Sequence, residues 1–299
     1  MSEERQQRIE SFSDALRVAR NRLAMSQSET PGLDAEVLLR HVLGIDRTQL
    51  FVQLPEPIDA VALASYTRLV EERAQGIPVA YLTGKREFMG LPFTVGPDVL
   101  VPRPETEVLV EWAIAWLRQR VQNLPTVVDI GTGSGAIAIS IAKTMGPDWP
   151  GRVLASDISA QALTVATGNR NRLNAEHRVH LVQGSLISWL EEPVDLVLAN
   201  LPYLRADQIS ENSQLAAEPR LALHGGTDGL DLIRELFADA PRVVRPGGAL
   251  GLEIDPGQRD EVLELARSAF PGSRLQMLPD LAGRDRHVTV ETAMTENQS

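Results

Sequence analysis

The segment VVDIGTGSGAIAI, residues 127–139, is the stretch that decides the fold. Residues 127–130 form a short apolar run, which is typical of a buried β-strand. The run passes through the glycine-rich residues 131–135 directly into an apolar stretch with helical spacing. Glycines let the backbone turn sharply there, and the free N–H groups at the start of a helix face any bound anion or nucleotide. The segment therefore predicts an α/β fold with a ligand site where this strand ends.

Strands and helices alternate on both sides of this segment. The alternation predicts a mostly parallel sheet with helices on both faces. Further strands are predicted at residues 153–156, 179–182, 196–199, 250–254 and 287–291. Helices are predicted at residues 105–121, 135–145, 159–173 and 228–244.

The first part of the chain has a different pattern. Apolar residues recur at helical spacing in three stretches before residue 78, and prolines and glycines separate them. The stretches AYLTGKREF and LPFTV lie on either side of Met89-Gly90 and are typical of the two strands of a hairpin. We therefore expect a helical domain at 1–78, a hairpin linker at 79–103, an α/β domain at 104–292 and a flexible tail at 293–299.

Composition restricts the class of protein. The 299 residues suit two domains. There is no cysteine for a disulfide or thiolate site, and the five histidines have no metal-ligand spacing, so no metal is expected. No apolar run reaches the roughly 20 residues of a membrane-spanning helix, and the first residues lack the apolar stretch of a signal peptide. A cytoplasmic protein without membrane association is expected. The net charge of −11 disfavours a surface that binds nucleic-acid phosphates.

Asp157 ends the strand that follows the glycine loop. A carboxylate at this position can accept hydrogen bonds from both hydroxyls of a ribose, which favours a cofactor that contains adenosine. The alternative is a packing turn, with Asp157 as a helix cap. The glycine spacing fits both a dinucleotide fingerprint and the first motif of class I S-adenosylmethionine-dependent methyltransferases. Asp129 fits the second pattern, but the loop alone leaves both cofactors open.

A second candidate follows the strand at 196–199. Asn200-Leu201-Pro202-Tyr203 stands at its carboxyl end, the edge at which open α/β sheets bind ligands. The Asn200 side chain and the Leu201 backbone each offer a carbonyl acceptor, and Tyr203 offers a flat ring. The group suits a planar –NH₂ whose hydrogens rest on two acceptors while its nitrogen faces an electrophile.

This tetrad resembles the Asn-Pro-Pro-Tyr signature of methyltransferases that act on exocyclic or amide nitrogens. Over roughly residues 30 to 290 the chain resembles the release factor glutamine methyltransferase family of the HemK/PrmC type. The resemblance rests on AYLTGKREFMGLPFTVGPDVLVPRPETE, DIGTGSGAIAI, NLPYL, EPRLALHGGTDGL and DLAGRDRHV. It implies a class I methyltransferase domain after a small helical domain. The implied reaction is N5-methylation of the glutamine in the Gly-Gly-Gln motif of class 1 peptide chain release factors.

The resemblance also implies roles for individual residues. The cofactor would be bound by Gly131, Thr132, Gly133, Ser134, Gly135 and Asp157, with Asn200 beside it. The substrate glutamine would be held by Asn200, Leu201, Pro202 and Tyr203. In two places the chain departs from the family: Leu201 replaces the first proline of the tetrad, and Leu186 stands where a tryptophan often borders the adenine.

Three other functions compete with this one. A DNA adenine-N6 methyltransferase uses a similar tetrad on a flipped base, but the net charge and the lack of an evident base-reading insertion oppose it. An NAD-dependent dehydrogenase has only the glycine loop in its favour. A non-catalytic module that binds partners when its cofactor is present would have no use for the tetrad.

Overall fold

The protein is described from a computed structural model, and the described residues are 9–26, 28–120 and 124–294. The chain divides into two compact units: Met1–Gly84 with Asn212–Ala217, and Lys85–Glu211 with Glu218–Ser299. This division differs from the expected one at residue 78, and it assigns the hairpin to the larger unit. Of the predicted tail, residues 295–299 lie outside the described part of the chain, as do residues 1–8 of the predicted helical domain.

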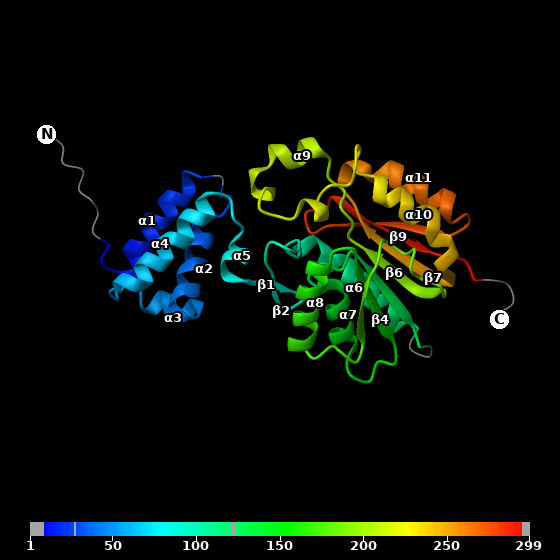
Figure 1. Cartoon of the computed structure of the whole chain (residues 1–299), viewed down its shortest axis with the longest axis horizontal. Helices are drawn as coiled ribbons and strands as arrows, with labels where there is room; N and C mark the ends of the chain where they lie inside the picture. Colours follow the sequence, from blue (N-terminus) through cyan, green and yellow to red (C-terminus); the bar gives the residue numbers. More distant parts are fainter. Residues whose placement is uncertain (1–8, 27, 121–123, 295–299) are drawn as a thin grey trace. The chain divides into compact units, whose positions relative to one another are not determined.

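The smaller unit is helical, as predicted (Figure 1). Its helices are α1 (Phe12–Ala24), α2 (Pro31–Leu43), α3 (Arg47–Val52), α4 (Ala60–Ala74) and α5 (Val79–Thr83). Ser11 and Asp59 begin α1 and α4 with side-chain caps on backbone N–H groups. The unit has a core of its own, which includes Leu38, Leu39 and Tyr66.

Helix α5 corrects the sequence prediction, which placed a strand from residue 80. Val79 and Leu82 both pack against the core of the smaller unit. Their spacing of three places them on one face of a helix, whereas in a strand they would point to opposite faces. Gly84 ends the helix in the left-handed conformation, with φ of 70°. The predicted hairpin follows, as β1 (Lys85–Phe88) and β2 (Leu91–Thr94).

The Met89-Gly90 turn was predicted correctly. Both residues have positive φ, 51° and 71°. Two such residues in a row are typical of the tight turns that match the twist of a hairpin.

The larger unit contains a seven-stranded sheet in the order β5-β4-β3-β6-β7-β9-β8. The strands are β3 (Thr126–Ile130), β4 (Arg152–Asp157), β5 (Val179–Gln183), β6 (Val194–Ala199), β7 (Val244–Glu253), β8 (Arg274–Pro279) and β9 (Asp285–Glu291). The pairs from β5 to β7 are parallel, and β9 runs antiparallel to β7 and β8. The mostly parallel sheet that the sequence predicted is confirmed.

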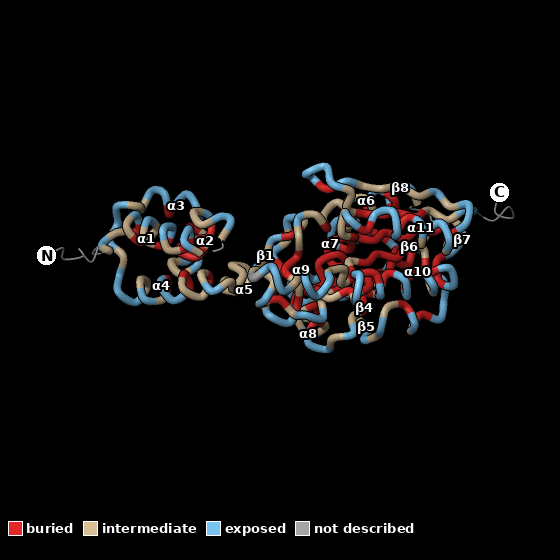
Figure 2. Tube along the Cα trace, turned by 90° about the horizontal axis from the view of Figure 1, so that it is seen from above, coloured by how far each residue is buried: buried red, intermediate tan, exposed pale blue. Residues whose placement is uncertain are grey.

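Helices cover both faces of this sheet (Figure 1). One layer contains α6 (Pro104–Arg118), α7 (Ala136–Met145) and α8 (Ala160–Arg172), and the other contains α10 (Asp231–Val243) and α11 (Arg259–Ala269). The short helix α9 spans Ala206–Glu211, and 3₁₀ turns lie at Ser213–Leu215, Arg220–Ala222 and Pro256–Gln258. Figure 2 shows the buried segments of this unit concentrated in the sheet. Central strands such as β3 and β6 are buried because helices cover them on both sides, which explains their continuous apolar runs.

Candidate functional site

The site lies where the order of the strands reverses. The chain runs from β3 outward to β4 and β5, and then returns to form β6 on the other side of β3. The glycine loop follows β3 and the tetrad follows β6, so the parallel pairing of these strands brings the two segments together. Ligands of open α/β sheets bind in the crevice at such a switch point.

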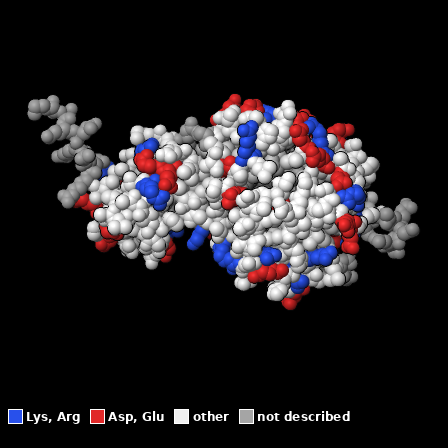
Figure 3. Space-filling model, viewed as in Figure 1, with Lys and Arg blue, Asp and Glu red and all other residues white. Residues whose placement is uncertain are grey.

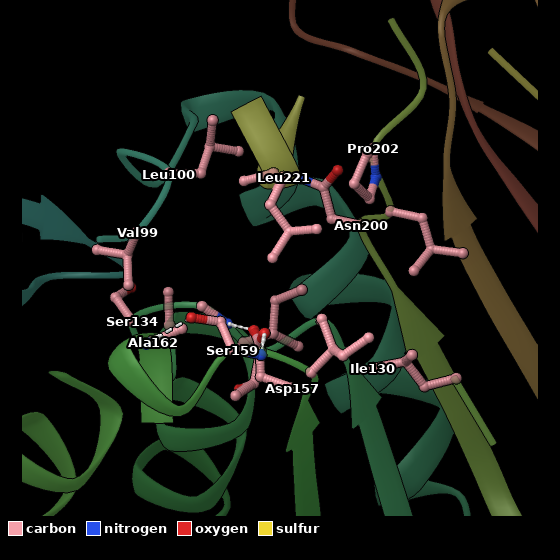
Figure 4. A pocket seen from close by; sticks show the side chains of 18 of the residues that line it. Val99, Leu100, Ile130, Ser134, Asp157, Ser159, Ala162, Asn200, Pro202 and Leu221 are labelled. Carbon is pink, nitrogen blue, oxygen red and sulfur yellow. Dashed lines mark hydrogen bonds between the residues drawn. The ribbon is translucent and has the colours of Figure 1, made fainter. Parts of the chain in front are cut away.

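A pocket opens at this edge of the sheet (Figure 4). In Figure 4, Asp157 and Ser159 lie across the pocket from Asn200 and Pro202. All the predicted site residues are described, and eight of them line the pocket. These are Gly131, Thr132, Gly133, Ser134, Asp157, Asn200, Leu201 and Pro202. Gly135 and Tyr203, although close in sequence, do not line it.

The glycine loop is left-handed at each of its glycines. Gly131 and Gly133 have φ of 68° and 54°, values that side chains other than glycine rarely adopt. A Cβ at Gly133 would have no neighbour closer than 4.0 Å, so the loop leaves open space in front of its backbone. At Gly135 a Cβ would lie 2.7 Å from Ile139 Cδ1, so this glycine allows close helix packing instead.

Asp157 connects the glycine loop to the start of α8. Its Oδ2 accepts from the Gly133 N–H and its Oδ1 from the Ser159 N–H, each at 2.9 Å. The side chain is half-buried, and burial raises the pKa of its carboxyl group. Each carboxylate oxygen has a second lone pair, so two acceptor positions remain for a ligand.

Asp129 is buried beneath the loop and is not a solvated strand end. Its Oδ2 accepts from the Thr132 hydroxyl at 2.6 Å and from the Ala138 N–H at 3.2 Å. Burial raises the pKa of this carboxyl group to about 7. Its Oδ1 has no hydrogen-bond partner in the described part of the chain. Asp129 supports the loop from below.

The Asn200 amide is held by a residue from a distant helix. Its Nδ2 donates to Oγ1 of Thr106, in the first turn of α6, at 3.1 Å. Thr106 also lines the pocket, and its hydroxyl donates to Glu253 Oε2 at 2.6 Å. Glu253 ends β7 and is 1% exposed. Thr106 and Glu253 were not among the residues predicted from the sequence, although Thr106 lies in the PRPETE run of a quoted segment.

Tyr203 is oriented away from its predicted position. Its ring packs against the core, and its hydroxyl donates to Glu253 Oε1 at 3.2 Å. Burial, reinforced by the neighbouring Glu253, raises the pKa of the phenol above its usual range, so it remains a donor. In this conformation Tyr203 fixes the end of the tetrad and offers no face to the pocket.

Two glycines allow another chain segment to approach the tetrad backbone. A Cβ at Gly225 would lie 2.5 Å from the Pro202 carbonyl oxygen, and one at Gly229 would lie 2.2 Å from that of Tyr203. The segment also pairs with the residue after the tetrad, because Leu204 N donates to the Leu223 carbonyl at 3.0 Å. The HGGTDG run thus supports the tetrad through close backbone packing.

Apolar side chains complete the pocket. Leu186 is part of this wall, and its φ of 46° is unusual for leucine. Ile130, Leu100 and the largely exposed Leu221 add further apolar surface. An apolar wall, an open glycine loop and a carboxylate with free acceptor positions together suit an adenosine group. The residues present therefore fit S-adenosylmethionine.

The described residues offer neither a metal-binding cluster nor a membrane-spanning helix. No cluster of histidine, aspartate or glutamate there could hold a metal ion. None of the helices in those ranges is both long and apolar enough to cross a membrane.

Two family profiles match parts of the chain. Residues 14–84 match the PrmC N-terminal domain, and residues 109–211 match the family described as ribosomal protein L11 methyltransferase (PrmA). Among solved structures, the hMettl16 catalytic domain in complex with a MAT2A 3′UTR hairpin superposes with a TM-score of 0.56. It is 16% identical and covers 77% of this chain and 84% of that one. That likeness supports the methyltransferase fold alone.

Curated relatives match over most of the chain. A release factor glutamine methyltransferase from Moorella thermoacetica is 43% identical, covering 91% of this chain and 95% of that protein. One from Deinococcus radiodurans is 39% identical, covering 94% and 98%. One from Burkholderia pseudomallei is 45% identical, covering 81% and 86%. With a class I methyltransferase fold and with similarity at this level over nearly the full length, the chain belongs to the release factor glutamine methyltransferase family.

Proposed function

We propose that this chain transfers a methyl group from S-adenosylmethionine to the side-chain amide nitrogen, N5, of the glutamine in the Gly-Gly-Gln motif of class 1 peptide chain release factors. The observation that carries the proposal is one pocket in which Asp157 and the glycine loop face Asn200 of the tetrad. The names of the relatives support the choice of substrate.

The cofactor would occupy the side of the pocket formed by the glycine loop. Gly131 and Gly133 leave room for it, and the free acceptor positions of Asp157 suit the two ribose hydroxyls. When bound, S-adenosylmethionine supplies an electrophilic methyl group on a sulfonium. We expect no metal in the reaction.

The substrate amide would be held by the tetrad. An amide nitrogen is a weak nucleophile because its lone pair is delocalised into the carbonyl group. Asn200 Oδ1 and the Leu201 carbonyl would accept the two N–H hydrogens, which keeps the nitrogen in line with the methyl group. Such positioning can lower a barrier by about 7–11 kcal/mol. Acceptors that face the positive charge developing on nitrogen stabilise the transition state further, and the proton then leaves to water.

The helical unit is proposed to recognise the release factor. The match to the PrmC N-terminal domain covers residues 14–84, and none of the described residues within Met1–Gly84 lines the pocket described above. We therefore assign substrate recognition to residues 1–78 and methyl transfer to residues 104–292, joined by residues 79–103. The reaction is expected in the cytoplasm, where release factors act, and without nucleic acid or membrane as stable partners.

The DNA adenine-N6 alternative is not favoured. The relatives are named for release factors, and the net charge is −11. On the face shown in Figure 3, basic side chains are interspersed with acidic ones and form no continuous basic patch. Binding of DNA phosphates requires such a patch.

A labelling experiment tests the proposal. The protein is incubated with S-adenosylmethionine carrying a labelled methyl group and with a release factor, the same release factor with alanine in place of the motif glutamine, or duplex DNA. We expect label only on the unaltered release factor, with one added methyl group on the Gly-Gly-Gln peptide by mass spectrometry. Label on DNA, or on the alanine variant at the same level, would overturn the proposal.

A further inference from the structure

Glu253 is a buried carboxylate connected to both ends of the tetrad. Its Oε2 accepts from the Thr106 hydroxyl, which in turn contacts Asn200, and its Oε1 accepts from the Tyr203 hydroxyl. Glu253 itself does not line the pocket, whereas Thr106 and Asn200 do. A chain of hydrogen bonds therefore runs from a buried carboxyl group to the pocket.

We propose that Glu253 is a positioning residue that sets the orientation of the Asn200 amide. The proposal rests on the proposed function, because it assumes that Asn200 presents an acceptor to the substrate amide. Thr106 transmits the orientation, so it shares this role.

The direction of the chain follows from its end. Both carboxyl oxygens of Glu253 accept from hydroxyl groups, and a hydroxyl has a single proton to donate. The Thr106 proton is directed to Glu253, so only lone pairs of Thr106 Oγ1 remain for Asn200. The Asn200 amide must then turn its –NH₂ toward Thr106. Its Oδ1 is left as the free end, and this result does not depend on how the two ends of the amide are assigned.

The opposite orientation of the Asn200 amide would remove its acceptor from the pocket. If the hydroxyl donated to Asn200 Oδ1 instead, the amide would present its own –NH₂ to the pocket. Two –NH₂ groups that face each other leave the substrate hydrogen assigned to Asn200 without an acceptor. A carboxylate at position 253 prevents this by fixing the proton of Thr106.

The groups around Glu253 leave it two hydroxyl donors. Tyr203 remains a donor because burial raises the pKa of its phenol. His287 Nε2 lies 3.6 Å from Glu253 Oε2, and its side chain is fully buried. Neither ring nitrogen of His287 has a hydrogen-bond partner within the described ranges. The two hydroxyls are thus the hydrogen-bond donors that this carboxylate has among the described residues.

The test compares four variants of the full chain. Thr106→Val keeps the shape but removes the hydroxyl, and Thr106→Ser keeps the hydroxyl. Glu253→Gln keeps the shape but adds a donor, so the direction of the chain is no longer fixed. Thr126→Val is the matched control, because Thr126 is also buried but lies at the start of β3, away from the pocket. Each variant is assayed for kcat with a release factor, for S-adenosylmethionine affinity by calorimetry, and for melting temperature.

We expect Thr106→Val to lower kcat at least tenfold and Glu253→Gln at least fivefold. Cofactor affinity should stay within threefold of wild type in both. Thr106→Ser and Thr126→Val should retain kcat within threefold. Because the two residues act through one chain of hydrogen bonds, their effects should not multiply. The kcat of the double variant Thr106→Val/Glu253→Gln should lie within twofold of that of Thr106→Val alone. A purely structural role would give multiplied losses and no rescue by serine.

Three results would overturn the proposal: kcat of folded Thr106→Val within twofold of wild type, a serine variant as slow as the valine variant, or losses that multiply in the double variant. If Thr106→Val does not fold, the comparison of Glu253→Gln with Thr106→Ser decides, and equal kcat values would refute the role. The wild-type protein separates this proposal from the proposed function. A wild type that does not methylate release factor refutes the function, whereas the variants decide the role of Glu253 once wild type is active.

Discussion

Changing Asp157 to asparagine should weaken S-adenosylmethionine binding by about one to two orders of magnitude. The side chain accepts from the Gly133 and Ser159 N–H groups, one at each oxygen. One acceptor position on each oxygen remains for the ribose diol. Asparagine keeps one oxygen and turns the other position into a donor. At most one ribose hydroxyl and one backbone N–H then keep their acceptor.

The magnitude follows from the lost contact. A hydrogen bond to a charged group contributes about 1.5–3 kcal/mol. Since each 1.4 kcal/mol is a factor of ten, losing one such bond raises the dissociation constant about 10- to 150-fold. Alanine removes both oxygens, so Asp157→Ala should reach or exceed the upper end of this range.

Calorimetry with S-adenosylmethionine measures the effect directly. Asp148→Asn is the matched control, since it makes the same chemical change at an exposed side chain beyond the C-terminal end of α7. Protonation should mimic the asparagine. Because burial raises the pKa of Asp157, wild-type affinity should fall as the pH is lowered toward that pKa, while the asparagine variant stays level. A folded Asp157→Asn protein that binds within twofold of wild type would refute the reasoning.

Three further predictions concern the support of the site. Gly229→Ala places a Cβ 2.2 Å from the Tyr203 carbonyl oxygen, so we expect losses of kcat and melting temperature larger than those of Gly84→Ala, which has similar φ but no neighbour within 4 Å. Asp129→Asn removes a carboxyl group whose pKa is raised from 3.8 to about 7 in the folded protein. Between pH 4 and 7 the folded wild type keeps this proton and the unfolded chain loses it, so the free energy of unfolding should fall by about 1.4 kcal/mol per pH unit as the pH rises. Urea unfolding should show no such loss in the variant. Leu201→Pro keeps the backbone carbonyl acceptor, so kcat should stay within threefold of wild type or rise modestly. It also replaces a side chain that is 3% exposed. The melting temperature measured by calorimetry should therefore fall by about 2–4 °C, for a loss of about 1 kcal/mol in stability. A tenfold drop in kcat of the folded Leu201→Pro protein would contradict its assigned role.

The fold could be predicted where local pattern and burial agree. Strands such as β3 and β6 are buried on both faces, so their sequences are short apolar runs with turn residues at each end. Strand β8 was missed because it lies at the edge of the sheet, with exposed and half-buried residues in alternation. Helix α5 was missed because it is only five residues long, and its helical conformation is favoured by the packing of Val79 and Leu82 against the core of the smaller unit.

The site could be predicted as far as the chain order of its motifs allows. The parallel sheet brings the glycine loop and the tetrad together, and that follows from the strand pattern. The roles of Gly135 and Tyr203 could not be predicted in this way. A Cβ at Gly135 would lie 3.5 Å from Cβ of Ala166 in α8, and Tyr203 is held by a hydrogen bond to Glu253; both partners lie far along the chain. Non-local contacts of this kind leave no spacing in the sequence.

The pocket is built entirely from residues 85–211 and 218–299. Under the proposed division of labour, the machinery for methyl transfer and the determinants of partner choice are encoded in separable stretches of the gene. Substitutions that retune the helical unit for another release factor would leave the pocket intact, and changes in the pocket would not disturb the helical core. Selection can therefore act on the two independently, and related enzymes with new protein substrates would arise by changes within the helical unit, Met1–Gly84 with Asn212–Ala217.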